Sequence, residues 1–258
     1  MLHILILAAV QGLTEFLPVS SSGHLVLLQH LFGGHEGDLF LDVVLHVGTL
    51  GSVLVVYRRD VVRLLRLDAP ARGYVLALMV GTQPAVVVGL LLKDVVEAVF
   101  QAPAFAAAGL LVTGLLLLST RRARPAADLD GPWEPRPVPW LKALLVGCAQ
   151  ALAICPGISR SGSTITASLW LGLARAEAAR FSFLLSVPAI GGALLLTLLD
   201  GDFDTRSGVP GLILGAVVAF VVGLLAIRWT RLAVIQQHFW KFAFYVLVLG
   251  TVALIVLL

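Results

Sequence analysis

The sequence predicts an all-α polytopic membrane protein with six transmembrane helices and two re-entrant helix–loop–helix hairpins that insert from opposite faces. Composition is the first reason: 59% of the 258 residues are hydrophobic, only 13% are charged, and the mean hydropathy is +0.99. A soluble domain of this length does not need so much apolar surface. The apolar runs are also continuous rather than alternating, which favours helices over a transmembrane β-barrel.

Six apolar segments are long enough to cross a bilayer as helices. They are residues 39–57, 74–92, 104–119, 178–199, 209–227 and 240–258. Two further apolar stretches, 1–33 and 141–174, are each interrupted near the middle by Pro, Gly and Ser residues. Each half is too short to span, and non-helical backbone at membrane depth persists only where protein buries it or where it lines a wet cavity. We therefore predict that both stretches are re-entrant hairpins.

The placement of Lys and Arg predicts the orientation of these segments. Residues 58–73, 120–142 and 228–241 are rich in arginine, whereas the opposite connections hold only Lys93 and Arg206 beside several acidic residues. The positive-inside rule places the arginine-rich loops in the cytoplasm. All six spans obey the rule only if the second hairpin enters and leaves on the cytoplasmic side, and the first on the outside. The net charge of +3 is small and topology accounts for its clusters, so nucleic-acid binding is not expected.

A weak internal repeat agrees with this orientation. The segment Pro18-Val-Ser-Ser-Ser-Gly23 matches Pro156-Gly-Ile-Ser-Arg-Ser-Gly162 with one insertion. A hairpin followed by three spans, repeated once, inverts the second half relative to the first because the number of spans is odd. Such inverted-topology repeats are common in transporters and place a site at the repeat interface.

The predicted organisation is a single membrane domain that covers residues 1–258. Its first repeat half is 1–120 and its second is 141–258. The linker between them, 121–140, contains five prolines and is expected to be extended and cytoplasmic.

The chain has two cysteines, Cys148 and Cys155. On one helix they would lie about 10 Å apart, which is too far for a disulfide. We expect both to be buried, unreactive thiols.

The first polar break, within Gln11–His24, places a carboxylate (Glu15), three hydroxyls (Ser20–Ser22) and an imidazole (His24) in an apolar context. Ionisable groups are costly in hydrocarbon and are therefore functional candidates. A proline stops the incoming helix and a glycine permits a tight turn, so that backbone N–H groups and hydroxyls can converge on an anion.

The second break repeats this pattern and adds Arg160, which stands between Ser159 and Ser161 and before Thr164. Arginine suits bidentate phosphate binding and stays charged in an apolar setting. If the two hairpin tips meet, Arg160 faces Glu15 and its neighbours. Together the motifs supply what phosphate chemistry in a membrane requires: a cation, hydroxyl donors, and a base or nucleophile.

Structural roles compete with these assignments. Buried serines can bond to their own helix or hold helices together. His24 can be a core histidine, and Glu15 with Arg160 can be only a buried ion pair. Asp42 and His46 lie one helical turn apart, and they either line the same pocket or serve the structure.

The two motifs resemble the signatures of the undecaprenyl-diphosphate phosphatase family, the bacitracin-resistance type of integral membrane phosphatase. One signature is (Glu/Gln)-Gly-x-x-Glu leading into Pro-Val-Ser-Ser-x-Gly-His, which appears here from Gln11 to His24. The other is Pro-Gly-x-Ser-Arg-Ser-x-x-Thr, which appears from Pro156 to Thr164. Both are long, in order and correctly separated, and the resemblance covers most of the chain.

The resemblance implies hydrolysis of undecaprenyl diphosphate to undecaprenyl phosphate and inorganic phosphate, which recycles the carrier lipid for cell-wall synthesis. It also implies a multi-pass protein of the bacterial plasma membrane, whose active site opens towards the outer face, and a divalent cation, Mg²⁺ or Ca²⁺. The expected catalytic residues are Glu15, Ser21, His24 and Arg160. The expected substrate-binding residues are Gln11, Ser20, Ser22, Ser159, Ser161 and Thr164.

Two departures from the family pattern bear on these expectations. Gln11 stands where many members have glutamate, so Glu15 is the only motif carboxylate and the only expected metal ligand. A metal would therefore depend more on phosphate oxygens and water. Tyr245-Val246 stands where many members have Tyr-Arg, which removes a second cationic contact.

The sequence leaves the nucleophile open among Ser21, His24 and an activated water, with a covalent step favoured. The competing class of function is transport, because a flippase or carrier of an anionic polyprenyl phosphate lipid would also use Arg160 and a serine-lined pocket. Such a carrier has less use for Glu15 and His24, which suit proton transfer. A compact bundle of this kind is compatible with a homodimer.

Overall fold

The computed structural model describes residues 1–31, 39–92, 95, 98–99, 102–128, 133–200 and 207–257, and the regular structure within them is entirely helical. The α-helices are α1 (Leu2–Phe16), α2 (Ser21–Leu31), α3 (Leu39–Val56), α4 (Arg58–Leu64), α5 (Ala69–Leu91), α7 (Pro103–Ser119), α8 (Trp140–Leu152), α9 (Arg160–Trp170), α10 (Arg175–Asp200), α11 (Gly208–Ile235) and α12 (Phe242–Leu257). Two short 3₁₀ turns, η1 (Thr120–Arg122) and η2 (Phe239–Lys241), follow α7 and precede α12.

Several helices are long and apolar enough to cross a membrane. Five meet this description: Ala69–Leu91, Pro103–Arg122, Arg175–Leu199, Gly208–Ile235 and Phe239–Leu257. A sixth span arises if α3 and α4 are taken together, with a bend of 78° between them. The chain is therefore a multi-pass membrane protein. The bend was not predicted; it directly precedes Arg58 and Arg59, whose exposed side chains are costly to bury in hydrocarbon.

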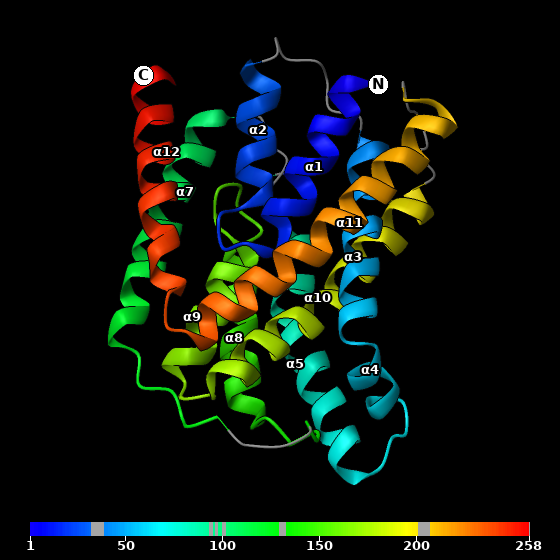
Figure 1. Ribbon diagram of the computed structural model, residues 1–258, viewed down its shortest axis with the longest axis vertical. Helices are drawn as coiled ribbons and strands as arrows, with labels where there is room; N and C mark the ends of the chain where they lie inside the picture. The colour runs from blue at the N-terminus through cyan, green and yellow to red at the C-terminus, as the bar shows by residue number, and fades with distance from the viewer. Residues whose placement is uncertain are drawn as a thin grey trace.

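Four shorter helices form two pairs, α1 with α2 and α8 with α9, and each pair turns back in the middle of the molecule. In Figure 1, α1 begins and α2 ends at the end of the molecule that holds both termini. By contrast, α8 begins and α9 ends at the end where the linker runs. Long helices surround the two turns, because α1 packs along α11, α8 along α5, and α7 along α12.

Local chemistry explains both turns. Ser20 has a left-handed backbone (φ 67°), and its Oγ accepts the N–H of Gly23 at 3.2 Å, which caps the start of α2. Ser159 caps α9 in the same way, by accepting the N–H of Gly162 at 3.0 Å. Gly157 has a φ of 85°, and a side chain there would collide with the backbone of α7. The two turns are thus built alike.

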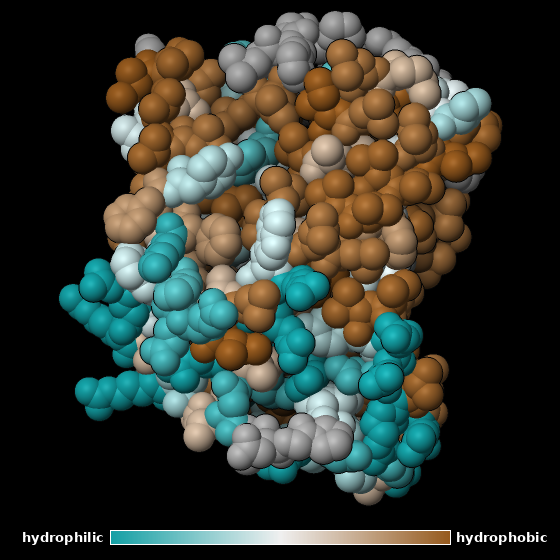
Figure 2. All heavy atoms as spheres, viewed as in Figure 1, coloured by the Kyte–Doolittle hydropathy of each residue, from teal (hydrophilic) through white to brown (hydrophobic). Residues whose placement is uncertain are grey.

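The surface divides into an apolar part and a polar end. Figure 2 shows hydrophobic residues over most of the upper part of the visible face, and hydrophilic residues gathered at the lower end, where Figure 1 places α4 and the linker. The five tryptophans all lie in or beside arginine-bearing segments: Trp133, Trp140, Trp170, Trp229 and Trp240. Tryptophan gathers at the membrane–water interface, so this end of the bundle has the composition of an interfacial layer.

A polar network ties the linker to this end. Glu177 of α10 accepts from the hydroxyl of Tyr74 at 2.6 Å and from Nε1 of Trp133 at 3.0 Å. Arg180 donates to Glu177 at 3.2 Å and to Asp60 of α4 at 2.9 Å. The network therefore joins α4, α5, α10 and the linker.

The prediction of buried cysteines is wrong. Cys148 and Cys155 are both free and exposed. The buried side of α8 instead carries Val146, Gly147 and Gln150, which leaves Cys148 on the opposite, outward side. A lipid-facing surface accepts a weakly polar thiol, so apolar context did not require burial.

Candidate active site

The two turns meet in the middle of the molecule. A Cβ added to Gly23 would lie 2.8 Å from the Cα of Gly157, so the turns touch through backbone. Ser161 donates from its hydroxyl to the carbonyl of Leu17 at 3.1 Å, which joins the second turn to the first. The hydroxyl of Thr113 on α7 donates to the carbonyl of Gly157 at 2.8 Å, which fixes the second turn to α7. The two motifs are therefore in contact, which is the condition under which Arg160 was expected to face Glu15.

Glu15, on the last turn of α1, lies at the centre of this contact. Its side chain is buried, and its Oε1 accepts from Nη2 of Arg160 at 2.8 Å. Its Oε2 accepts from the hydroxyl of Ser21 at 2.7 Å and from the amide of Gln11 at 3.0 Å. A carboxylate, a hydroxyl and a guanidinium from both motifs thus form one cluster.

Two polar atoms of this cluster have no hydrogen-bond partner among the described residues. Nη1 of Arg160 is one, and Oε1 of Gln11 is the other; both are buried. An unpaired buried donor or acceptor is costly, so each is a place where a ligand atom would be favourable. The Nη1 donor suits a phosphate oxygen.

His24 contacts a residue that the sequence did not suggest. Its Nδ1 lies 2.7 Å from the carbonyl of Ser20, so this nitrogen carries a proton and donates. In the neutral ring Nε2 is then an acceptor, and the hydroxyl of Tyr245 on α12 lies 2.7 Å from it. His24 therefore directs Nε2 towards Tyr245, and its two hydrogen bonds are to the Ser20 carbonyl and the Tyr245 hydroxyl rather than to Ser21 or Glu15.

His46 of α3 lies beside Glu15 instead. Its Nε2 is 3.6 Å from Oε2 of Glu15, while its Nδ1 donates to the carbonyl of Asp42 at 2.7 Å. About a third of its side chain is exposed, 35%. Of the two open interpretations of this histidine, the geometry favours a place beside the Glu15 cluster over a purely structural role. The spacing of Asp42 and His46 was the only signal for it in the sequence.

The hydroxyls divide into two groups. Ser21 and Ser22 are partly exposed, and Ser22 has only a weak contact of 3.3 Å with Ser20. By contrast Ser20, Ser159 and Thr164 are buried and already used: Ser20 and Ser159 cap helices, and Thr164 bonds to the carbonyl of Arg160 at 2.8 Å. The buried group shapes the turns, and the exposed group is accessible to a ligand.

Few groups here could hold a metal ion. Within the part of the chain that the structure describes, no cluster of three or more His, Cys, Asp or Glu residues is close enough to bind one. The oxygens available to a divalent cation are those of Glu15 and the unpaired Oε1 of Gln11. Such a cation would need further oxygens from a ligand and from water, which is the usual mode for Mg²⁺.

Comparison with known proteins gives the same family as the motifs. The model of the family "Bacitracin resistance protein BacA" matches residues 4–252. The undecaprenyl-diphosphatase of Desulfatibacillum aliphaticivorans is 42% identical, and the alignment covers 98% of each chain. That of Desulfosudis oleivorans is 46% identical over 96% of each chain, and that of Rhodopirellula baltica is 44% identical over 89% of this chain and 87% of the relative. On the geometry of the two motifs and on this full-length similarity, the chain belongs to the BacA family of undecaprenyl-diphosphatases.

Proposed function

We propose that the protein hydrolyses undecaprenyl diphosphate to undecaprenyl phosphate and inorganic phosphate, and so returns the carrier lipid to cell-wall synthesis. The observation that carries the proposal is the cluster of Glu15, Ser21 and Arg160, in which a hydroxyl, its base and a phosphate-binding cation meet. Its full-length relatives are named undecaprenyl-diphosphatases, which supplies the substrate.

The diphosphate binds where the two turns meet. Ser21 and Arg160 are the first residues of α2 and α9, so the N-termini of both helices lie at the site. Helix N-termini favour anions through their free N–H groups and the helix dipole. Arg160 adds the unpaired Nη1 donor, and its side chain is 14% exposed.

Ser21 is the nucleophile in this proposal. Its Oγ attacks the terminal phosphorus while its proton passes to Oε2 of Glu15, 2.7 Å away. The bond from that phosphorus to the bridging oxygen breaks, and undecaprenyl phosphate leaves. Glu15 passes the proton of Ser21 to solvent through His46, 3.6 Å away. The ionised Glu15 then takes a proton from the water that attacks the phosphoserine and returns it to the Oγ of Ser21, which releases inorganic phosphate. Protonation of Glu15 weakens its attraction for Arg160, so the guanidinium becomes free to bind the phosphoryl oxygens as charge develops on them.

His24 has a positioning role here rather than the role of nucleophile. Its Nδ1 proton is held by the carbonyl of Ser20, next to the nucleophile, and its Nε2 is held by Tyr245. His24 thereby fixes the turn that presents Ser21. His46, 3.6 Å from Glu15, is placed to exchange the proton that Glu15 receives.

We also propose that a divalent cation binds with the substrate. Gln11 Oε1 and Glu15 would hold it, with the remaining ligands being phosphate oxygens and water. When bound, such a cation supplies positive charge that neutralises the phosphate oxygens.

The site is proposed to open towards the outer face of the membrane, and the two hairpins to be the re-entrant parts of an inverted repeat. Support comes from the opposite directions of the two short pairs and from the arginine-rich end at which α8 begins and α9 ends. The matching turns capped by Ser20 and Ser159, and the packing of α1 on α11 and α8 on α5, agree with a repeat.

The decisive experiment is phosphate release from undecaprenyl diphosphate by purified protein in detergent with Mg²⁺ or Ca²⁺. We expect release by the wild type, a loss of about 10³-fold or more in Arg160→Ala, and an unchanged rate in Arg66→Ala, an exposed arginine elsewhere. A folded wild-type protein that binds the lipid but releases no phosphate would contradict the proposal and support a transporter of an anionic lipid.

A further inference from the structure

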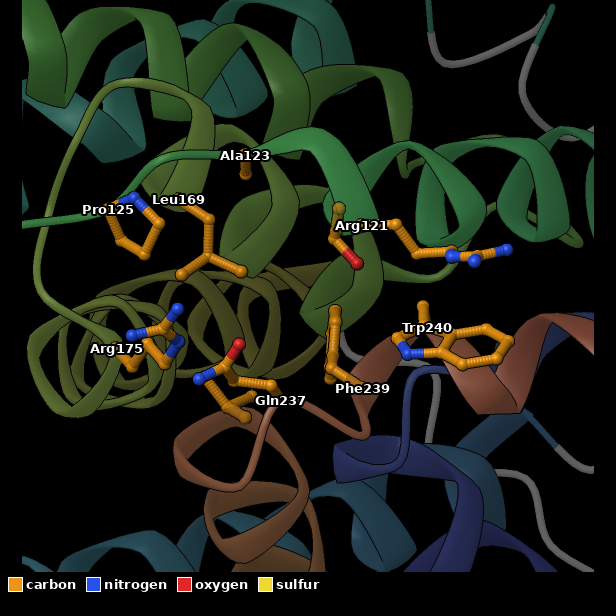
Figure 3. Close-up of a pocket in the computed structure, with 10 residues that line it drawn as sticks. Arg121, Ala123, Pro125, Leu169, Arg175, Gln237, Phe239 and Trp240 are labelled. Carbon is orange, nitrogen blue, oxygen red and sulfur yellow. The ribbon is translucent and has the colours of Figure 1, made fainter.

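A pocket lies at the arginine-rich end of the bundle, away from the site at the turns (Figure 3). Its volume is about 230 Å³. It is formed where α7 passes into the linker, α9 passes into α10, and α11 turns into η2. No step of the proposed hydrolysis uses it.

Two arginines give this pocket its charge. Arg175 and Gln237 lie at one end of it in Figure 3, and Arg121 and Trp240 at the other. The guanidinium of Arg121 lies 4.6 Å from the ring centroid of Trp240, which holds it at the pocket by a cation–π contact. Gln237 adds an amide from a left-handed position (φ 60°) just after α11, so the backbone turns its side chain to the pocket.

These arginines differ from others at the same end. Arg63 and Arg180 are each bonded to two carboxylates. Within the described part of the chain, no carboxylate forms an ion pair with Arg121 or Arg175. Asp128, beside α10, is occupied in accepting the N–H of Ala176 at 2.8 Å. Among the described residues, the two arginines that line the pocket therefore have no carboxylate within ion-pair distance.

An apolar groove continues from the pocket along the outside of α7. Its volume is about 670 Å³, and it shares Arg121 with the pocket. Leu115, Leu118 and Trp170 line it, and Trp170 is fixed by donating from Nε1 to Ser119 at 3.0 Å. Because α7 ends its span at Arg122, the groove follows the hydrocarbon part of the helix and the pocket lies at headgroup depth.

We propose that this pocket and groove bind one anionic lipid, with a phosphate headgroup at Arg121, where the pocket meets the groove, and a hydrocarbon chain along Leu115 and Leu118, while Arg175 adds positive charge further into the pocket. An anionic phospholipid would use both the positive charge of the pocket and the apolar surface of the groove. A free anion would leave the groove unused, and a zwitterionic lipid would bring a second cation to the arginines. A basic pocket between transmembrane helices at the interface is a known setting for such headgroups. A glycerophospholipid and a polyprenyl phosphate share this chemistry.

The test is lipid binding by the purified full-length protein, measured by native mass spectrometry against phosphatidylglycerol, undecaprenyl phosphate, phosphatidylcholine and inorganic phosphate. The test variant is Arg121→Gln with Arg175→Gln. The matched control is Arg66→Gln with Arg72→Gln, two exposed arginines that line neither the pocket nor the groove. Arg121→Lys with Arg175→Lys retains the charge and guards against a loss of binding that comes from misfolding.

Wild type and control should bind one of the two anionic lipids at least about tenfold more tightly than the test variant does, and the lysine variant should recover part of the difference. Whichever of phosphatidylglycerol and undecaprenyl phosphate binds more tightly is the class of lipid that the site prefers. The proposal is overturned if the test variant and the control bind the anionic lipids with equal affinity. It is also overturned if the wild type binds phosphatidylcholine as tightly as the anionic lipids, or if inorganic phosphate displaces the bound lipid as effectively as free lipid does. The test variant should still release phosphate from undecaprenyl diphosphate, so failure here is distinguishable from failure of the proposed function.

Discussion

Ser21 donates its hydroxyl to Glu15 across a helix break: the two side chains belong to α2 and α1 and lie 2.7 Å apart. The turn between them, in which Ser20 has a left-handed backbone, brings the two side chains together. Strain of this kind is typical of functional sites. Since Glu15 also binds Arg160, one carboxylate orients both the nucleophile and the cation of the proposed reaction.

Replacing the carboxylate should remove the base. We expect Glu15→Gln to lower the rate of phosphate release by about 10²–10⁴-fold, because the amide cannot take the proton of Ser21. Its melting temperature should also fall, since Arg160 loses its counter-charge. Glu134→Gln is the control, because Glu134 forms only an exposed pair with Arg63. A rate for Glu15→Gln close to that of Glu134→Gln would exclude Glu15 as the base.

The two accessible serines should differ in their effect on turnover. Ser21→Ala removes the proposed nucleophile and should reduce phosphate release by about 10³-fold or more. Ser22→Ala, which removes only a weak contact with Ser20, should reduce it less than about tenfold. Mass spectrometry of acid-quenched wild type should detect phosphate on Ser21. Equal losses in both variants, with no phosphoserine, would favour direct attack by water.

The bond between Tyr245 and His24 should contribute modestly to turnover. Tyr245→Phe removes the hydroxyl 2.7 Å from Nε2 of His24 and should lower kcat by roughly two- to thirteenfold, which is the worth of one hydrogen bond. Tyr57→Phe is the matched control, since the Tyr57 hydroxyl is buried without a partner among the described residues. If the control loses as much kcat as Tyr245→Phe, the bond has no specific role.

Chelation should stop the reaction if a divalent cation is needed. We expect EDTA to abolish phosphate release and Mg²⁺ or Ca²⁺ to restore it. Gln11→Leu, which removes the unpaired Oε1 together with the amide that donates to Glu15, should raise the cation concentration required for half-maximal rate. A wild-type rate that persists in EDTA would eliminate the cation from the proposal.

The free energy of unfolding should fall at low pH through protonation of Asp68, which caps α5 outside the membrane. Its pKa is lowered because the carboxylate accepts the N–H of Ala71 and the guanidinium of Arg63. The native pKa is therefore below that of the unfolded chain, so the stabilisation is complete above an ordinary aspartate pKa of about 3.9 and is lost as pH falls through the lower native value.

The melting temperature of detergent-solubilised variants checks this prediction. Asp68→Ala should melt at a lower temperature than the wild type at neutral pH, and the difference should shrink in acid. Asp68→Ser keeps a capping oxygen without a titrating group, so it should lie closer to the wild type at neutral pH and depend less on acid. A constant difference between wild type and Asp68→Ala at every pH would contradict the assignment.

The sequence predicted the helices and indicated that Glu15 and Arg160 need polar partners, because both inferences depend on local or strongly unfavourable interactions. Continuous apolar runs of span length leave few alternatives to helix, and a buried Glu15 and Arg160 each require a partner. The contact of His24 with Tyr245 was not predictable in this way, because it joins residues 221 apart and depends on how α12 packs. Likewise, Ser20 and Ser159 were expected to bind substrate, and their additional role as helix caps depends on turn geometry that the sequence did not specify.

The distance along the chain between Glu15 and Arg160, 145 residues, has a consequence for biosynthesis. The ribosome completes α1 long before α9, so the nascent protein must hold a carboxylate at membrane depth without its counter-charge. During that interval the hydrolytic centre is incomplete, because Arg160 has not yet been made. Each copy thus becomes active only after its second half has been inserted, which keeps incomplete chains from acting on the carrier lipid.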